Sequence, residues 1–199
     1  ILVKGDGNVS LNNLLTVPGS ISVFSSHGII SAKSGSSFQA GNGDVSLTGD
    51  ICLNDVLVNA VGGNVKFKAP HFITLQNSSI NAFRDDGRRG GNVIMHSGGN
   101  FTFGMYGDHH KRYAGGNIRL VANCDNVEIA CDNEFNANGG SITIASLNAD
   151  AIIGNNNKFN AFQGKDGNPG NICIAAGDDI KIGNYNKFNA VGGDIALAA

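Results

Sequence analysis

A short pattern recurs along the whole chain: a glycine, then Asn, Asp or Ser, then apolar residues at alternate positions. From Gly43 to Gly193 it recurs at steps of 20, 28, 25, 24, 30 and 23 residues, with a mean of 25. A repeat of about this length makes one turn of a three-sided β-solenoid. The occurrences are GNVSL (7–11), GSISV (19–23), GDVSL (43–47), GNVKF (63–67), GNVIM (91–95), GNIRL (116–120), GSITI (140–144), GNICI (170–174) and GDIAL (193–197).

Two residue types are over-represented, with 29 Gly and 27 Asn among 199 residues. Both break helices, and both tolerate the left-handed backbone conformations that tight turns need. No window shows sustained helical periodicity. The composition therefore predicts short strands joined by many tight turns.

Each repeat contains three strand-like pieces. The first is the alternating segment behind the repeated glycine, which predicts a strand with one buried face. The second is shorter, as in FITL (72–75) and DIKI (179–182). The third is the most regular, as in NKFNA (157–161) and again NKFNA (186–190).

Stacked coils place equivalent positions above one another at about 4.7–4.9 Å. The third piece then predicts an interior column of apolar side chains and, at a buried corner, a ladder of asparagines whose amides pair along the stack. Tyr113 interrupts that ladder. The column contains Phe38, Phe135, Phe159 and Phe188, with Val58 and Ile80 in other coils, and the ladder contains Asn59, Asn81, Asn136, Asn160 and Asn189.

These patterns predict an all-β chain, a right-handed parallel β-helix (β-solenoid) of about eight coils with about 25 residues per coil. A β-sandwich gives no reason for such strict self-similarity, and a propeller needs about 40–50 residues per blade. We interpret residues 1–199 as a single β-helix segment, a fragment of a longer repeat array.

GGDIALAA (192–199), GGNIRLVA (115–122) and the NKFNA units resemble repeats of the filamentous-haemagglutinin-type (two-partner secreted) exoproteins of Gram-negative bacteria. The resemblance extends over nearly the whole chain. It implies a right-handed β-helix that is secreted or displayed at the bacterial cell surface, as the adhesin-like, non-enzymatic shaft of a large virulence protein. It also implies an outer-membrane transporter for the full-length protein and a host-cell or matrix glycan or protein as partner. The NPNG-type secretion motif is absent from this segment, and its four cysteines depart from a family that is usually poor in Cys.

The four cysteines are expected to be free thiols. Cys52 and Cys173 fall at outward positions of distant coils, and Cys124 and Cys131 fall near opposite ends of one second strand. That strand separates the second pair by roughly 20 Å at about 3.3 Å per residue, which is beyond disulfide reach. The spacing matches no zinc motif.

Insertions lengthen the coils at FRDDGRRGG (83–91), GMYGDHHKRY (104–113) and FQGKDGNPG (162–170). Loops on a rigid scaffold often carry function, so the first two are predicted to contact an anionic or polar ligand. Ordinary solvated loops are the competing interpretation. The residues concerned are Arg84, Asp85, Asp86, Arg88, Arg89, Asp108, His109, His110, Lys111 and Arg112.

A second candidate surface is a basic stripe on the first strands. Lys66, Lys68, His96 and Arg119 fall at outward positions of three consecutive coils. Cations spaced by the coil repeat suit an anionic glycan. Ordinary surface charge for solubility is the competing interpretation.

No catalytic arrangement is evident. Outward strand positions carry almost no Asp or Glu, and a β-helix enzyme that acts on polysaccharides would need them there. Neighbouring His side chains rarely converge on one ion, so no metal or cofactor is predicted.

The net charge of −2 disfavours nucleic acid as a partner, and no apolar run is long enough for membrane insertion. A polysaccharide-acting enzyme and a self-assembling extracellular filament remain the alternatives to an adhesin-like scaffold.

Overall fold

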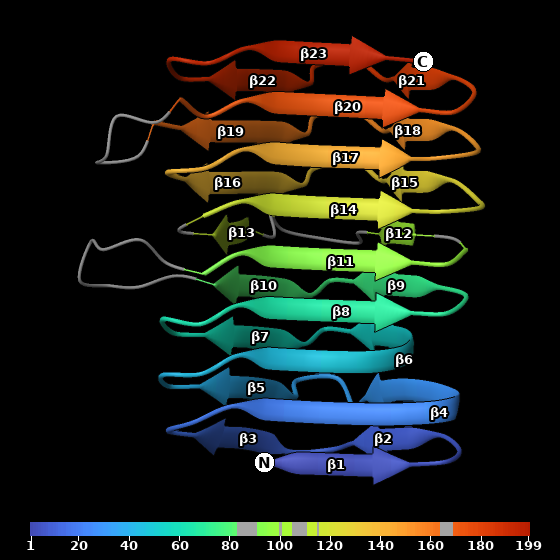
Figure 1. Ribbon diagram of the computed structural model, residues 1–199, viewed down its shortest axis with the longest axis vertical. Helices are drawn as coiled ribbons and strands as arrows, with labels where there is room; N and C mark the ends of the chain where they lie inside the picture. The colour runs from blue at the N-terminus through green and yellow to red at the C-terminus, as the bar shows by residue number, and fades with distance from the viewer. Residues whose placement is uncertain (83–90, 100, 105–110, 115, 164–168) are drawn as a thin grey trace.

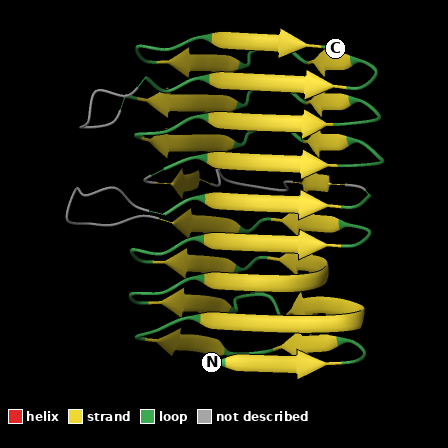
Figure 2. Cartoon of the chain, in the orientation of Figure 1, coloured by secondary structure: helices red, strands yellow, loops and turns green. Residues whose placement is uncertain are grey.

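The computed structural model describes residues 1–82, 91–99, 101–104, 111–114, 116–163 and 169–199. In these residues the regular structure consists of β-strands without helices, and neighbouring strands pair in parallel (Figures 1 and 2). The strands form three stacks around one interior. The predicted fold class, a parallel β-solenoid, is confirmed.

The solenoid is right-handed. In Figure 1 the chain rises from the N-terminus, and the near strands run left to right while the far strands run right to left. Seven turns separate Ile21 from Ile195 in the described residues, with steps of 20 to 30 residues. These steps average about 25 residues per turn, in agreement with the predicted period.

The first stack begins each coil and the second follows it around a corner. Two long strands, β4 (Ile21–Ala32) and β6 (Val45–Asn54), continue across that corner and join both stacks into a 15-stranded sheet. The other strands of the first stack are β1 (Leu2–Gly5), β8 (Val65–Ala69), β11 (Val93–Ser97), β14 (Ile118–Ala122), β17 (Ile142–Ser146), β20 (Ile172–Ala176) and β23 (Ile195–Ala198). Those of the second are β2 (Val9–Leu11), β9 (Ile73–Gln76), β12 (Phe101–Gly104), β15 (Val127–Ile129), β18 (Ala151–Ile153) and β21 (Ile180–Ile182).

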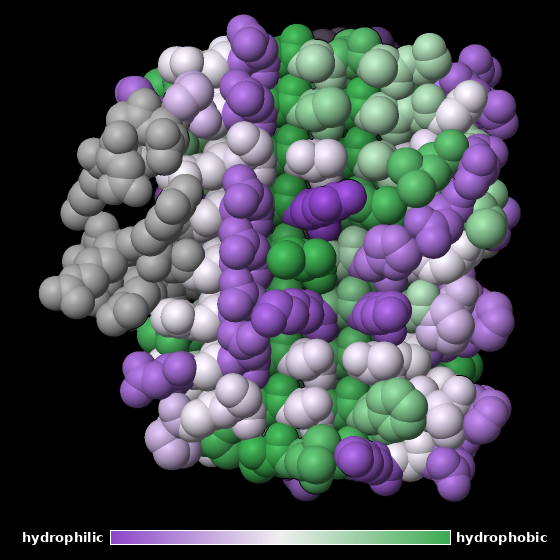
Figure 3. Space-filling view, in the orientation of Figure 1, coloured by the Kyte–Doolittle hydropathy of each residue, from purple (hydrophilic) through white to green (hydrophobic). Residues whose placement is uncertain are grey.

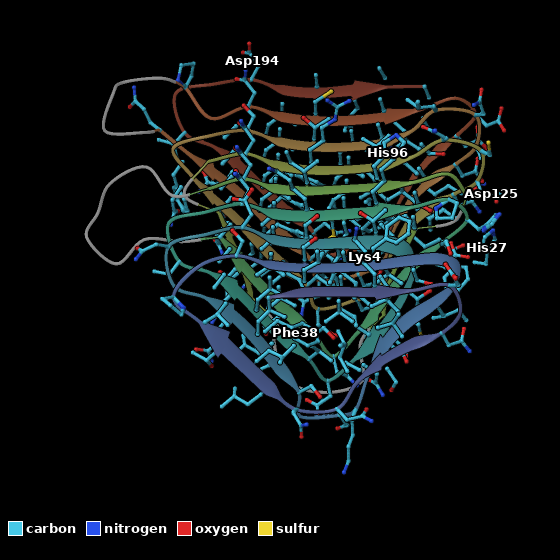
Figure 4. The ribbon with its side chains drawn as sticks, turned by 60° about the horizontal axis from the view of Figure 1, so that its bottom comes forward. Lys4, His27, Phe38, His96, Asp125 and Asp194 are labelled. Atoms are coloured by element: carbon cyan, nitrogen blue, oxygen red, sulfur yellow. The ribbon has the colours of Figure 1, made fainter. Side chains whose placement is uncertain are left out.

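The third stack is a separate eight-stranded sheet in the described part of the chain. It lies on the far side in Figure 1 and closes the three-sided cross-section that Figure 4 shows, with Phe38 inside. Its strands are β3 (Leu14–Val17), β5 (Ser37–Ala40), β7 (Leu57–Ala60), β10 (Ser79–Ala82), β13 (Lys111–Ala114), β16 (Glu134–Asn138), β19 (Lys158–Phe162) and β22 (Lys187–Ala190).

The predicted interior columns are confirmed. Phe135 pairs in register with Phe159, and Phe159 with Phe188. Their rings stack with centroids 5.1 Å and 4.9 Å apart and nearly parallel planes. Phe38 pairs with Val58 lower in the same column, and both are fully buried. The coil repeat thus converts one sequence position into a continuous apolar core.

The predicted asparagine ladder is in register, but its location was wrong. Asn81 donates to Asn59 at 2.7 Å and Asn160 donates to Asn136 at 2.9 Å, both through side-chain amides. These residues alternate with buried Phe and Ala positions, so they lie on the outer side of the third stack instead of at a buried corner. Asn136 is largely covered and Asn189 is exposed. Among the described residues, Asn189 makes no hydrogen bond to Asn160, although the two are in register.

A different set of asparagines occupies the corner between the second and third stacks. Asn133 and Asn157 are buried there, and side-chain oxygens accept backbone N–H groups from the neighbouring coil. The residue two positions before the third-stack strand has a left-handed backbone in six coils, a conformation that Asn and Asp tolerate better than most residues. The positive φ positions at this corner are Gly35, Asp55, Asn77, Asp132, Asn156 and Tyr185.

The repeated glycine and its polar successor build the corner before the first stack. A Cβ atom on Gly63 would lie 2.3 Å from the carbonyl oxygen of Gly43, so only glycine lets these coils stack. The polar residue that follows accepts the backbone N–H of its equivalent in the next coil at 2.8–3.2 Å. This second ladder runs through Ser20, Asp44, Asn64, Asn92, Asn117, Ser141, Asn171 and Asp194.

All four cysteines are free, as predicted. Cys52 and Cys173 lie at outward positions of the second and first stacks, respectively. Cys124 and Cys131 lie in the turns on either side of β15.

Candidate functional site

The outer side of the first stack carries the predicted basic stripe. Lys66 pairs in register with Ile94, which pairs with Arg119. In the adjacent column Lys68 pairs with His96, which pairs with Val121. These six positions on β8, β11 and β14 form a grid of three rows and two columns, hereafter the basic grid.

Strand geometry sets the spacing of the basic grid. Successive coils are about 4.7–4.9 Å apart, so Lys66 and Arg119 stand about 9–10 Å apart along the axis. Lys66 and Lys68 are two residues apart on one strand, which corresponds to about 6.4–6.8 Å. Backbone hydrogen bonds hold all three strands, so these separations are built into the sheet.

The other two positions of the basic grid carry apolar side chains. Ile94 is 37% exposed, whereas Val121 is only 3% exposed although it occupies an outward position. Figure 3 shows hydrophilic side chains over the middle coils of this face and apolar ones over its C-terminal coils. His96 lies on the outer side of the first stack (Figure 4). The charge therefore concentrates on the middle coils.

Asp44 partly neutralises one corner of the grid. Its carboxylate lies 2.7 Å from Nζ of Lys66 and accepts the backbone N–H of Asn64 at 2.8 Å. Partial burial opposes ionisation, but these hydrogen bonds outweigh it and lower the pKa of Asp44 below 3.8. Both partners are substantially exposed, so this pair contributes little to stability. Lys68, His96 and Arg119 have no ion pair within the described residues.

The basic grid is suited to hold an extended anion. The cations of the grid, of which Lys68 and Arg119 form no ion pair among the described residues, give a positive local potential although the chain as a whole is weakly acidic. The Ile94 side chain between them offers an apolar contact to the body of the ligand.

The other predicted ligand contacts fall in two groups. Arg84, Asp85, Asp86, Arg88, Arg89, Asp108, His109 and His110 lie outside the described residues. Lys111 and Arg112 were expected in a corner insertion, but their backbone belongs to β13, in register with Glu134 and Phe135. The expectation was wrong because the ladder of the third stack needs a strand between β10 and β16 to pair their backbone groups.

Among the described residues, no group of three or more His, Cys, Asp or Glu side chains is arranged to hold a metal ion. That part of the chain also has no helix long and apolar enough to span a membrane.

Comparison with known protein families, curated proteins and solved structures finds no match to this chain. The fold and the chemistry of the surfaces are therefore what point to a function.

Sequence reasoning missed the role of Asp44. Its signal was present, because Asp44 occupies the repeated polar position one residue before the first strand. The short distance between Asp44 and Lys66 depends on the 20-residue step between their two coils, which only the structure aligns.

Proposed function

We propose that this chain is a non-enzymatic binding scaffold of a secreted or cell-surface protein, adhesin-like in its role, that binds an anionic host or matrix glycan on the basic grid. The observation that carries the proposal is the register of Lys66, Lys68, His96 and Arg119 on three adjacent strands. The resemblance to filamentous-haemagglutinin-type exoproteins adds an outer-membrane transporter as the route of the full-length protein to the surface.

A glycan fits the basic grid better than a nucleic acid does. Proteins that bind single-stranded nucleic acid usually combine cations with aromatic rings on which bases stack. The six grid positions contain no Phe, Tyr or Trp. A sulfated or carboxylated glycan needs only cations at suitable spacing and an apolar contact, and both are present.

The test compares two variants that lose the same charge. The grid variant carries Lys66→Ser, Lys68→Ser and Arg119→Ser. The control carries Lys33→Ser, Lys158→Ser and Lys187→Ser, which lie outside the first stack. Binding to immobilised heparin, as a sulfated glycan, is measured over a salt series, because screening weakens exposed charge interactions.

We expect the folded grid variant to lose most of the binding and the control to retain it. The basic grid is not the binding surface if the two folded variants bind heparin equally, or if the unmodified chain does not bind heparin. Binding of a single-stranded nucleic acid or an acidic peptide in preference to the glycan would overturn the assigned ligand class.

A further inference from the structure

The chain contains two Asn-Gly pairs, Asn42–Gly43 and Asn138–Gly139. In such a pair the glycine backbone nitrogen, after losing its proton to solvent base, can attack Cγ of the asparagine. A C–N bond forms, the Cγ–Nδ2 bond breaks and ammonia leaves. Water then opens the cyclic imide at either carbonyl to give aspartate or isoaspartate. Glycine favours the reaction because it lacks a Cβ that would hinder the attack.

In the first pair, neither the attacking backbone nitrogen of Gly43 nor the side-chain amide of Asn42 is hydrogen-bonded within the described residues. Asn42 is exposed, in the bend between β5 and β6. Within the described residues its side chain makes no hydrogen bond, and neither does the backbone N–H of Gly43. The backbone N–H of Asn42 itself donates to the carbonyl of Pro18 at 2.8 Å. The segment is therefore anchored at Asn42, while the attacking nitrogen is unoccupied.

The second pair has its nucleophile engaged. Asn138 ends strand β16 and pairs in register with Phe162. The N–H of Gly139 donates to the carbonyl of Phe162 at 3.0 Å, and Gly139 is buried. Attack by this nitrogen first requires local opening of the strand end, and opening costs free energy that a free N–H does not need.

We propose that Asn42 is a site of spontaneous deamidation in the folded chain and that Asn138 is protected. The product places a new carboxylate two residues from Asp44, the partner of Lys66. The isoaspartate form also lengthens the backbone beside Gly43. That corner is tightly packed, because a Cβ on Gly43 would lie 2.3 Å from Oγ of Ser20. The modification thus acts on the ladder that joins Ser20 to Asp44.

The test is peptide mapping of the folded chain after incubation in mildly alkaline buffer, with isoaspartate and released ammonia measured at intervals. We expect conversion at Asn42 to be at least about tenfold faster than at Asn138. The same incubation in denaturant removes the structure and should bring the two rates close together. An Asn42→Gln variant should abolish the fast phase of ammonia release.

Two outcomes would overturn the proposal. One is equal or faster conversion at Asn138 in the folded chain. The other is a preference for Asn42 that persists unchanged in denaturant, since that would trace the difference to local sequence instead of to the hydrogen bond of Gly139.

Discussion

Oδ1 of Asn157 accepts both the backbone N–H of Asn133, at 2.8 Å, and its side-chain amide, at 3.2 Å. Both residues are buried, with exposures of 0% and 1%. The backbone N–H of Asn157 in turn donates to Oδ1 of Asn186 at 2.7 Å. Three asparagines therefore connect three successive coils at the corner between the second and third stacks.

This relationship predicts a large effect for Asn157→Leu. The substitution leaves the buried N–H of Asn133 without an acceptor, and an unpaired buried donor costs about 1–3 kcal/mol. Urea denaturation measures the change in free energy of unfolding. Asn160→Leu is the matched control three residues away, on the outer side of β19, and we expect it to cost less. Equal losses would show that burial does not distinguish the two positions.

The phenylalanine column predicts a second stability difference. Phe159 is fully buried between the rings of Phe135 and Phe188, so Phe159→Ala opens a cavity in the core. We expect a loss of about 3–5 kcal/mol, measured by the same method. Phe188→Ala is the control, because Phe188 is only half-buried and has a ring on one side. If Phe188→Ala costs as much, the stack is not what stabilises this region.

Asp50 predicts a pH dependence. It accepts the backbone N–H groups of His71 at 2.9 Å and Phe72 at 3.2 Å, and its second oxygen lies 2.9 Å from Nδ1 of His71. Partial burial opposes ionisation, but these hydrogen bonds outweigh it and hold the pKa of Asp50 below 3.8. Because the folded pKa is lowered, the contribution to stability is present above about pH 3.8 and is lost as pH falls through the folded pKa.

We therefore expect Asp50→Asn to lower the free energy of unfolding at neutral pH, and the difference from the unmodified chain to shrink as the pH falls below about 4. Denaturation over a pH series measures it. Asp178→Asn, which removes an exposed carboxylate, is the control for net charge. A difference for Asp50→Asn that does not change with pH would contradict the assigned role of the ionised carboxylate.

The interior of the solenoid was predictable because extended backbone alternates. In GNVKF the buried residues Val65 and Phe67 follow from period-two spacing, and the 25-residue repeat aligns them with their equivalents in other coils. The basic grid was predictable for the same reason, since Lys66 and Arg119 occupy the intervening outward positions. The register of Tyr113 was also predictable, since the repeat aligned it with the asparagine ladder and it pairs with Asn136. Only the boundary was wrong, because the interpretation of 104–113 as an insertion included Lys111 and Arg112, which belong to the strand.

By itself, the amino-acid sequence determined the period, the three strands per coil and the identity of the inner columns. The tertiary structure alone decided which asparagines of NKFNA are buried. Asn157 follows the left-handed residue Asn156 and turns into the corner, whereas Asn160 lies on extended strand and points outward. The tertiary structure alone also placed Asp44 beside Lys66. Alternation is a local property of the backbone, but contacts between coils depend on where each turn bends and on how many residues each coil contains.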